Sequence, residues 1–114
     1  MSRDDATLLD ILKAGRLVVE FKGKLIKRDF LRDTKTQSAI LHQLLVIGEA
    51  VKRLSEDFRT EHSEIPWTRI AGMRDKLIHA YDTVDLDEVW KTITKEIPPL
   101  ISFLEPLVPQ EKSK

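Results

Sequence analysis

Residues 34–58 read TKTQSAILHQLLVIGEAVKRLSEDF. Apolar residues recur in this stretch at intervals of three and four, which is the spacing of one face of an α-helix. The apolar stripe consists of Ile40, Leu44, Ile47, Val51, Leu54 and Phe58. The stretch therefore predicts one long amphipathic helix, with Thr34 as its N-cap and Gln37 completing a capping box.

A second apolar edge runs beside this stripe. It is formed by Leu41, Leu45 and Gly48. In a small monomer a helix rarely needs two apolar edges. We take the second edge as a hint of a helix–helix contact between two copies of the chain.

The N-terminal segment continues the helical spacing. Apolar residues predict a first helix over residues 5–20, followed by a connector over residues 21–28 in which Gly23 marks the break. A short amphipathic stretch over residues 28–32 adds a turn of helix before the long one begins.

Two further helices follow the long one. Pro66 suits the first position of a helix over residues 67–81, and Asp85 is the capping signal of a last helix. The pair Pro98-Pro99 interrupts that last helix, so we expect a kink near residues 95–97. The pattern predicts an all-α, up-and-down bundle of four main helices with short helical turns, as one domain over residues 1–108 and a frayed tail over residues 109–114.

Composition narrows the possible functions of this bundle. The 114 residues include no cysteine, which excludes disulfides, thiol catalysis and cysteine-ligated metals for this chain alone. No apolar run approaches the ~20 residues of a membrane span, and the polar residues 1–5 are unlike a signal peptide, so we expect a cytoplasmic protein. Lys plus Arg and Asp plus Glu both total 19, so binding to nucleic acid would need a local basic patch.

The most informative segment is MRDKLIHAY, residues 73–81. At about 100° per helical residue, Arg74, Asp75 and His79 lie opposite the apolar stripe. Arg offers a planar fork for a phosphate, and His moves protons near neutral pH. Asp75 is suited to orient His79 or to hold Arg74. Ile78, an apolar residue among these polar groups, suggests that the face opens onto a cleft or a partner.

Spacing alone also fits a structural role for the same cluster. An Arg–Asp–His group on a helix is more commonly a solvated face or a salt bridge. Tyr81, considered by itself, suits packing at the end of the helix.

Two blocks of sequence carry a resemblance to a known family. The first runs from QSAI to IGEAVK over residues 37–52, and the second runs from IPW to GMRDKLIHAY over residues 65–81. The second block holds a complete signature of Arg, a polar residue, His and Tyr, represented by Arg74, Asp75, His79 and Tyr81. On these residues the chain resembles the HepT-like toxins of the HEPN superfamily, the helical half of bacterial and archaeal toxin–antitoxin pairs.

The resemblance implies a HEPN-like fold and a metal-independent endoribonuclease that needs no cofactor. Such toxins act as homodimers, with the Arg–His motifs of two subunits facing across one composite cleft. By analogy, His79 takes or delivers a proton while the RNA 2′-hydroxyl attacks the adjacent phosphorus. Arg74 holds the phosphate and stabilises the anionic transition state, and Asp75 orients these groups. The three histidines, His42, His62 and His79, lack a recognisable zinc spacing.

The resemblance also implies a partner. In a type VII-like toxin–antitoxin system, a minimal nucleotidyltransferase neutralises the toxin by transferring AMP to the motif tyrosine, here Tyr81. An attached AMP would add bulk and negative charge beside Arg74 and so exclude RNA. Masking by complex formation is the alternative.

Lys22, Lys24, Lys27 and Arg28 form the best local basic patch for an RNA backbone, with no acidic residue among residues 22–28. A solvated connector explains the same charges equally well. Two other functions stay open: a non-catalytic dimeric module that binds nucleotide or its partner through Arg74, and a purely structural helical adaptor.

Overall fold

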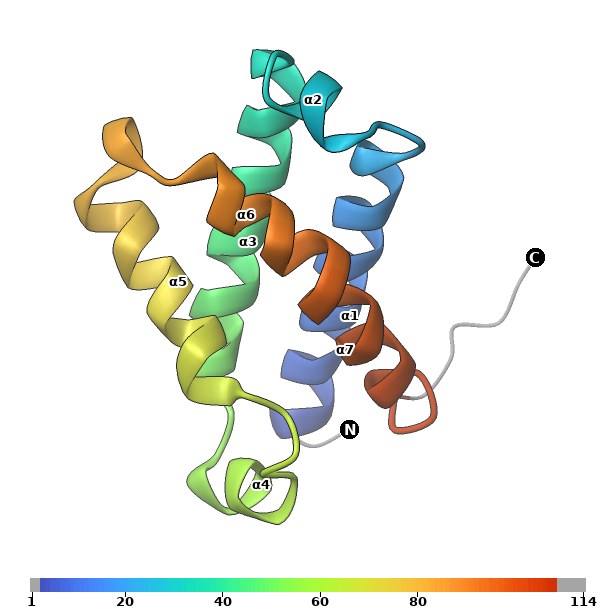
Figure 1. Cartoon of the computed structure of the whole chain (residues 1–114). Helices are drawn as coiled ribbons and strands as arrows, with labels where there is room; N and C mark the ends of the chain where they lie inside the picture. Colours follow the sequence, from blue (N-terminus) through green and yellow to red (C-terminus); the bar gives the residue numbers. More distant parts are fainter. Residues whose placement is uncertain (1–2, 109–114) are drawn as a thin grey trace.

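The computed structural model of the chain describes residues 3–108. Figure 1 shows a run of helices, and residues 3–108 contain no β-strand. The elements are α1 (Arg3–Lys22), α2 (Lys27–Phe30), α3 (Thr34–Arg53), α4 (Glu56–Glu61), α5 (Trp67–His79), the 3₁₀ turn η1 (Tyr81–Thr83), α6 (Leu86–Lys91), the π-helical segment η2 (Thr92–Glu96) and α7 (Ile97–Leu104). The predicted all-α fold class is confirmed, whereas the predicted tail over residues 109–114 lies outside the described residues.

The long helices alternate in direction, and the run from α6 to α7 crosses them (Figure 1). α3 lies in the middle, packed against α1 on one side and α5 on the other, and α7 packs against α1. The apolar stripes of these helices meet in one core. Its largest fully buried side chains are Leu8, Ile11, Leu12, Val18, Phe30, Ile40, Ile47, Leu77, Ile93, Ile97, Leu100 and Leu104.

The start of α3 differs from the prediction by one residue. Asp33, not Thr34, is the N-cap, and its carboxylate accepts hydrogen bonds from the backbone N–H and the hydroxyl of Thr36. Gln37 does not complete a capping box, because its side chain donates to the backbone carbonyl of Phe30. That bond joins α3 to the short α2. The prediction missed the cap because Asp and Thr are both good N-caps and stand next to each other.

The end of α3 was also predicted wrongly. The helix stops at Arg53, and Leu54 has an extended backbone that still places its side chain in the core. Ser55 then caps α4 by accepting from the backbone N–H of Phe58, and Asp4 of α1 accepts from both the backbone and the hydroxyl of Ser55. Phe58 therefore belongs to α4. The apolar spacing of the sequence continues past the end of α3 because the Leu54 side chain stays buried.

The C-terminal helix changes its geometry just before Pro98-Pro99, where the sequence predicts an interruption. Asp85 caps α6, as expected, by accepting from the backbone N–H groups of Asp87 and Glu88. The helix then widens into η2, where the N–H of Ile97 bonds the carbonyl of Thr92, five residues back. Pro98 lacks an N–H and its ring crowds the preceding turn, and a π turn relieves both problems without ending the helix.

Candidate active site

α5 carries the three residues of the predicted catalytic cluster. One side of this helix enters the core through Trp67, Ile70, Met73 and Leu77. Arg74 and Asp75 lie on the flank that faces α3, because their side chains bond to residues of that helix. His79 is the last residue of α5.

α3 and α5 come into direct contact at Gly48. A Cβ on Gly48 would lie 2.2 Å from the Cβ of Arg74 and 3.3 Å from its Cα. Only a glycine lets the two helices approach this closely. Gly48 belongs to the second apolar edge that the sequence suggested as a contact between copies. That suggestion was wrong at Gly48, which α5 of the same chain covers.

Two carboxylates hold the guanidinium of Arg74. Its Nε and Nη2 donate to Oε2 of Glu49 at 3.0 and 2.8 Å, and its Nη1 donates to Oδ1 of Asp75 at 3.0 Å. Nζ of Lys52 donates to the same Asp75 oxygen at 2.6 Å. Glu49, Arg74, Asp75 and Lys52 thus form a chain of alternating charges, which we call the Arg74 network.

The Arg74 network favours the charged forms of Arg74 and Asp75. The hydrogen bonds that Arg74 donates to Glu49, and then to Asp75, raise the pKa of Arg74 above its ordinary value. Hydrogen bonds from Lys52 and then from Arg74 lower the pKa of Asp75 below 3.8. With two acids and two bases, the network carries no net charge at neutral pH.

Arg74 nevertheless retains donors for a ligand. A guanidinium has five N–H donors, and three of those of Arg74 are used within the network. The side chain is 23% exposed, and the remaining two donors make no hydrogen bond within residues 3–108. A planar, pre-oriented fork of this kind suits an anion such as a phosphate.

His79 is exposed at the end of α5. Its imidazole makes no hydrogen bond or ion pair with any residue among 3–108. Of the two roles expected for Asp75, the structure shows the second: its carboxylate holds Arg74 and Lys52 and makes no bond to His79.

Tyr81 lies beyond the end of α5, not within it as predicted. The backbone of Ala80 leaves helical geometry, and Tyr81 opens the 3₁₀ turn η1. The Tyr81 side chain is 51% exposed, so packing at the helix end does not account for it. Ile78, one residue before His79, is 47% exposed. The end of α5 thus presents an imidazole, a phenol and an aliphatic side chain to solvent.

The predicted basic patch is largely engaged within the chain. Lys22 lies 5.2 Å from the ring centre of Trp90, and Lys27 pairs with Asp87 at 2.9 Å. Arg28 lies 3.8 Å from the carboxylate of its neighbour Asp29. Lys24 is exposed and makes no ion pair within residues 3–108. The patch borders the start of α6, and no hydrogen bond or ion pair in the described part of the chain joins it to Arg74 or His79.

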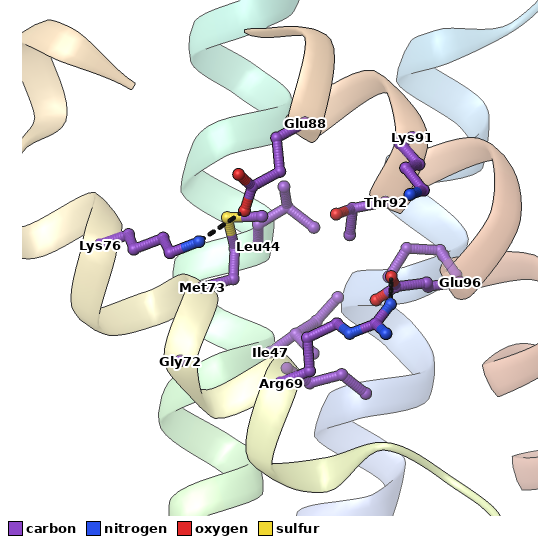
Figure 2. Close-up of a pocket in the computed structure, with 12 residues that line it drawn as sticks. Leu44, Ile47, Arg69, Gly72, Met73, Lys76, Glu88, Lys91, Thr92 and Glu96 are labelled. Carbon is purple, nitrogen blue, oxygen red and sulfur yellow. Dashed lines mark hydrogen bonds and ion pairs between the residues drawn. The ribbon is translucent and has the colours of Figure 1, made fainter. Parts of the chain in front are cut away.

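A groove of about 410 Å³ lies on the flank of α5 away from Glu49, between α3, α5 and the α6–η2 run (Figure 2). Two ion pairs cross it, Lys76–Glu88 and Arg69–Glu96. Its lining does not include Arg74, Asp75, His79 or Tyr81. The groove is therefore separate from the predicted catalytic cluster.

The sequence did not indicate Glu49 and Lys52 as partners of Arg74 and Asp75, and it placed Gly48 in a contact between copies. Their spacing was the available signal: Glu49 and Lys52 are three apart on one helix and therefore share a face, and Gly48 beside them permits close approach. Nothing in the sequence pairs that face with Arg74 and Asp75.

Residues 3–108 hold no group of three or more His, Cys, Asp or Glu side chains able to bind a metal ion. No helix within these residues combines the length and the apolar character that crossing a membrane requires.

Comparison with known proteins adds independent information. The family model described as Ribonuclease HepT-like matches residues 11–107. The chain is 48% identical over 100 residues to a protein of Thermococcus cleftensis named probable ribonuclease HepT, and the match covers 88% of this chain and 91% of that protein. No solved structure gives a significant match.

Two further relatives have names that describe them provisionally as RNases. The one from Caldanaerobacter subterraneus is 42% identical over 102 residues, covering 90% of this chain and 91% of the relative. The one from Methanocaldococcus jannaschii is 38% identical over 103 residues, covering 90% of this chain and 85% of the relative.

Proposed function

The chain belongs to the family of HepT-like ribonucleases, and from this premise we propose that it is a metal-independent endoribonuclease whose site is built around Arg74 and His79. One observation carries the proposal. Arg74 is held near the surface with two donors unused, and an exposed imidazole follows five residues later on the same helix. Together they supply an anion fork and a proton carrier.

The proposed reaction uses the 2′-hydroxyl of RNA as the nucleophile. His79 removes its proton while the oxygen attacks the adjacent phosphorus, and the bond from phosphorus to the 5′-oxygen breaks. The leaving 5′-oxygen receives a proton, which gives a 2′,3′-cyclic phosphate and a 5′-hydroxyl. Arg74 binds the phosphate and stabilises the charge that develops on its oxygens. Asp75 accepts from Nη1 and thereby fixes the side of the guanidinium that Glu49 does not contact.

The site is proposed to be composite, formed by two copies of the chain. One subunit contributes a single imidazole, whereas the reaction needs one group to take a proton and another to deliver one. Exposed Ile78 beside His79 gives a second subunit an apolar surface to cover. Two Arg74 networks facing each other would then enclose the RNA phosphate.

The chain is further proposed to be the toxin of a type VII-like toxin–antitoxin pair, neutralised by a minimal nucleotidyltransferase. The acceptor would be Tyr81, which is exposed two residues after His79. Its phenolic oxygen would attack the α-phosphorus of ATP and release pyrophosphate. The added phosphate would compete for the donors of Arg74 and repel RNA.

A non-catalytic nucleotide-binding or partner-binding module is the second candidate function. The observation that favours it is the zero net charge of the Arg74 network, which suits recognition of one phosphate better than strong attraction of a polyanion. Binding of AMP that depends on Arg74, without any cleavage of RNA, would identify this function.

The experiment compares Arg74→Ala and His79→Ala with the unchanged chain. The readouts are growth after induced expression and cleavage of total RNA by purified protein in EDTA. Arg69→Ala is the matched control, because Arg69 is on the same helix and its ion pair with Glu96 lies on the other flank. We expect both site variants to lose toxicity and cleavage and the control to keep them. Unchanged activity of both site variants would refute the proposal.

A further inference from the structure

We infer that Glu49 is a positioning residue for Arg74, and that it fixes the guanidinium in the orientation that meets the RNA phosphate. This inference rests on the proposed ribonuclease function. Both hydrogen bonds to Glu49 come from a single edge of the guanidinium, since Oε2 of Glu49 accepts from Nε and from Nη2 of Arg74. The two remaining N–H donors lie on the terminal nitrogens, where a phosphate is bound.

Glu49 anchors Arg74 to a different helix. Asp75 is the next residue after Arg74, so its bond to the guanidinium places Arg74 only relative to α5. Glu49 lies on α3, beside the Gly48 contact that sets how close the two helices lie. Arg has a long side chain with many rotamers, and a second helix that bonds its Nε removes most of that freedom.

Glu49 has no other contact that would explain its position. Its side chain is 47% exposed, and within residues 3–108 it makes no hydrogen bond or ion pair except with Arg74. Replacing Glu49 therefore removes the support of Arg74 and disturbs little else.

Two substitutions separate the geometric effect of Glu49 from its charge. In Glu49→Gln the amide oxygen still accepts from Nε and Nη2, but the negative charge is gone. In Glu49→Ala both bonds are lost. A positioning role predicts that kcat of Glu49→Gln stays close to that of the unchanged chain and that kcat of Glu49→Ala falls. Glu49→Gln should also lower KM for RNA, because a neutral side chain beside Arg74 leaves more of its positive charge for the phosphate.

The test measures kcat and KM for RNA cleavage in EDTA. We expect kcat to fall about 10-fold or more in Glu49→Ala, the size of effect seen when a supporting residue around a reactive group is removed. Glu49→Gln should stay within about threefold of the unchanged chain. Glu88→Gln is the matched control: Glu88 is 42% exposed and pairs with Lys76 on the other flank of α5.

Three results would overturn the inference. The first is an unchanged kcat in Glu49→Ala. The second is a raised kcat in Glu49→Ala, which would mean that Glu49 competes with the phosphate for Arg74. The third is an equal fall in kcat in Glu49→Gln and Glu49→Ala. Each is distinct from failure of the proposed function, in which Arg74→Ala itself leaves cleavage unchanged.

A second readout is independent of activity. In ¹⁵N-labelled protein, the Nε–H signal of Arg74 should exchange slowly with water in the unchanged chain and in Glu49→Gln, and rapidly in Glu49→Ala. Circular dichroism of each variant shows whether the fold is retained. Equal exchange in all three proteins would contradict the bond on which the inference depends.

Discussion

Gly48 lies directly beneath Arg74, so that a Cβ on Gly48 would come within 2.2 Å of the Arg74 Cβ. This contact fixes the separation of α3 and α5 at the centre of the candidate site. It brings Glu49 and Lys52 within hydrogen-bonding distance of Arg74 and Asp75. The packing of the fold and the geometry of the site thus depend on the same glycine.

Gly48→Ala should destabilise the protein. The nearest atoms are the Cβ, Cγ and Cα of Arg74, and because its Cα and Cβ cannot move away by side-chain rotation, the helices must separate. Overpacking of this kind costs about 1–3 kcal/mol in the free energy of unfolding, and urea denaturation measures it. The same variant should loosen Arg74 and reduce RNA cleavage.

Gly72→Ala is the matched control for this prediction. Gly72 also lies within a long helix, but a Cβ there would meet nothing within 4 Å. Helix propensity alone should stabilise this variant by up to about 1 kcal/mol. If the two alanine variants shift the free energy of unfolding by the same amount and in the same direction, the close contact at Gly48 does not exist in solution.

Stability should fall on acidification partly through Asp4. Hydrogen bonds from the hydroxyl and the backbone N–H of Ser55 lower the pKa of Asp4 in the folded chain below 3.8. A carboxyl with a lowered folded pKa stabilises the fold at pH values well above 3.8, and this contribution is lost as pH falls through the folded pKa. The free energy of unfolding of Asp4→Asn should therefore be lower than that of the unchanged chain at neutral pH, and the gap should narrow in acid. A difference in the free energy of unfolding between the two proteins that does not change with pH would contradict this role of Asp4.

Ile78→Glu should weaken the proposed dimer. A charge on this exposed apolar position beside His79 would oppose burial against a second copy. Light scattering at working concentration measures the mass. Ile26→Glu is the control, since Ile26 is 52% exposed but lies at the start of α2, away from α5. If the unchanged chain has the mass of a monomer in this measurement, the proposal of a site shared by two copies is wrong.

Co-expression with the proposed partner, a minimal nucleotidyltransferase, should add the mass of one AMP residue to the chain. The addition should be absent in Tyr81→Phe, which keeps the ring and removes only the acceptor oxygen. Intact-mass measurement decides between modification and masking. A chain that is neutralised without any gain in mass would favour masking.

Local patterns in the sequence were sufficient to predict the long helices but not α4 as a separate helix. Periodic apolar residues identified the long helices, Asp85 marked the start of α6, and Pro98-Pro99 marked the change in helix geometry. The errors fell where local signals compete. Asp33 and Thr34 are adjacent capping residues, and Leu54 continues the apolar period through a break that Ser55 creates.

The candidate site was predictable only along one helix. Arg74, Asp75 and His79 share α5, so their spacing relates them directly. The bond between Arg74 and Glu49 joins residues 25 apart, and it depends on how α3 and α5 cross. The partners of the basic connector, such as Asp87 for Lys27, are likewise set by tertiary packing. Closeness in sequence therefore does not show which of these charges are paired within the chain.

The most direct test of the central claim is single-turnover cleavage of a mapped RNA oligonucleotide in EDTA, compared with the same oligonucleotide lacking the 2′-hydroxyl at the cleaved nucleotide. The proposed mechanism predicts a 2′,3′-cyclic phosphate product from the RNA and no cleavage of the deoxy analogue. It also predicts that His79→Ala lowers the rate by about 100-fold or more. Cleavage of the deoxy analogue at the same position, or an unchanged rate in His79→Ala, would contradict the proposed mechanism.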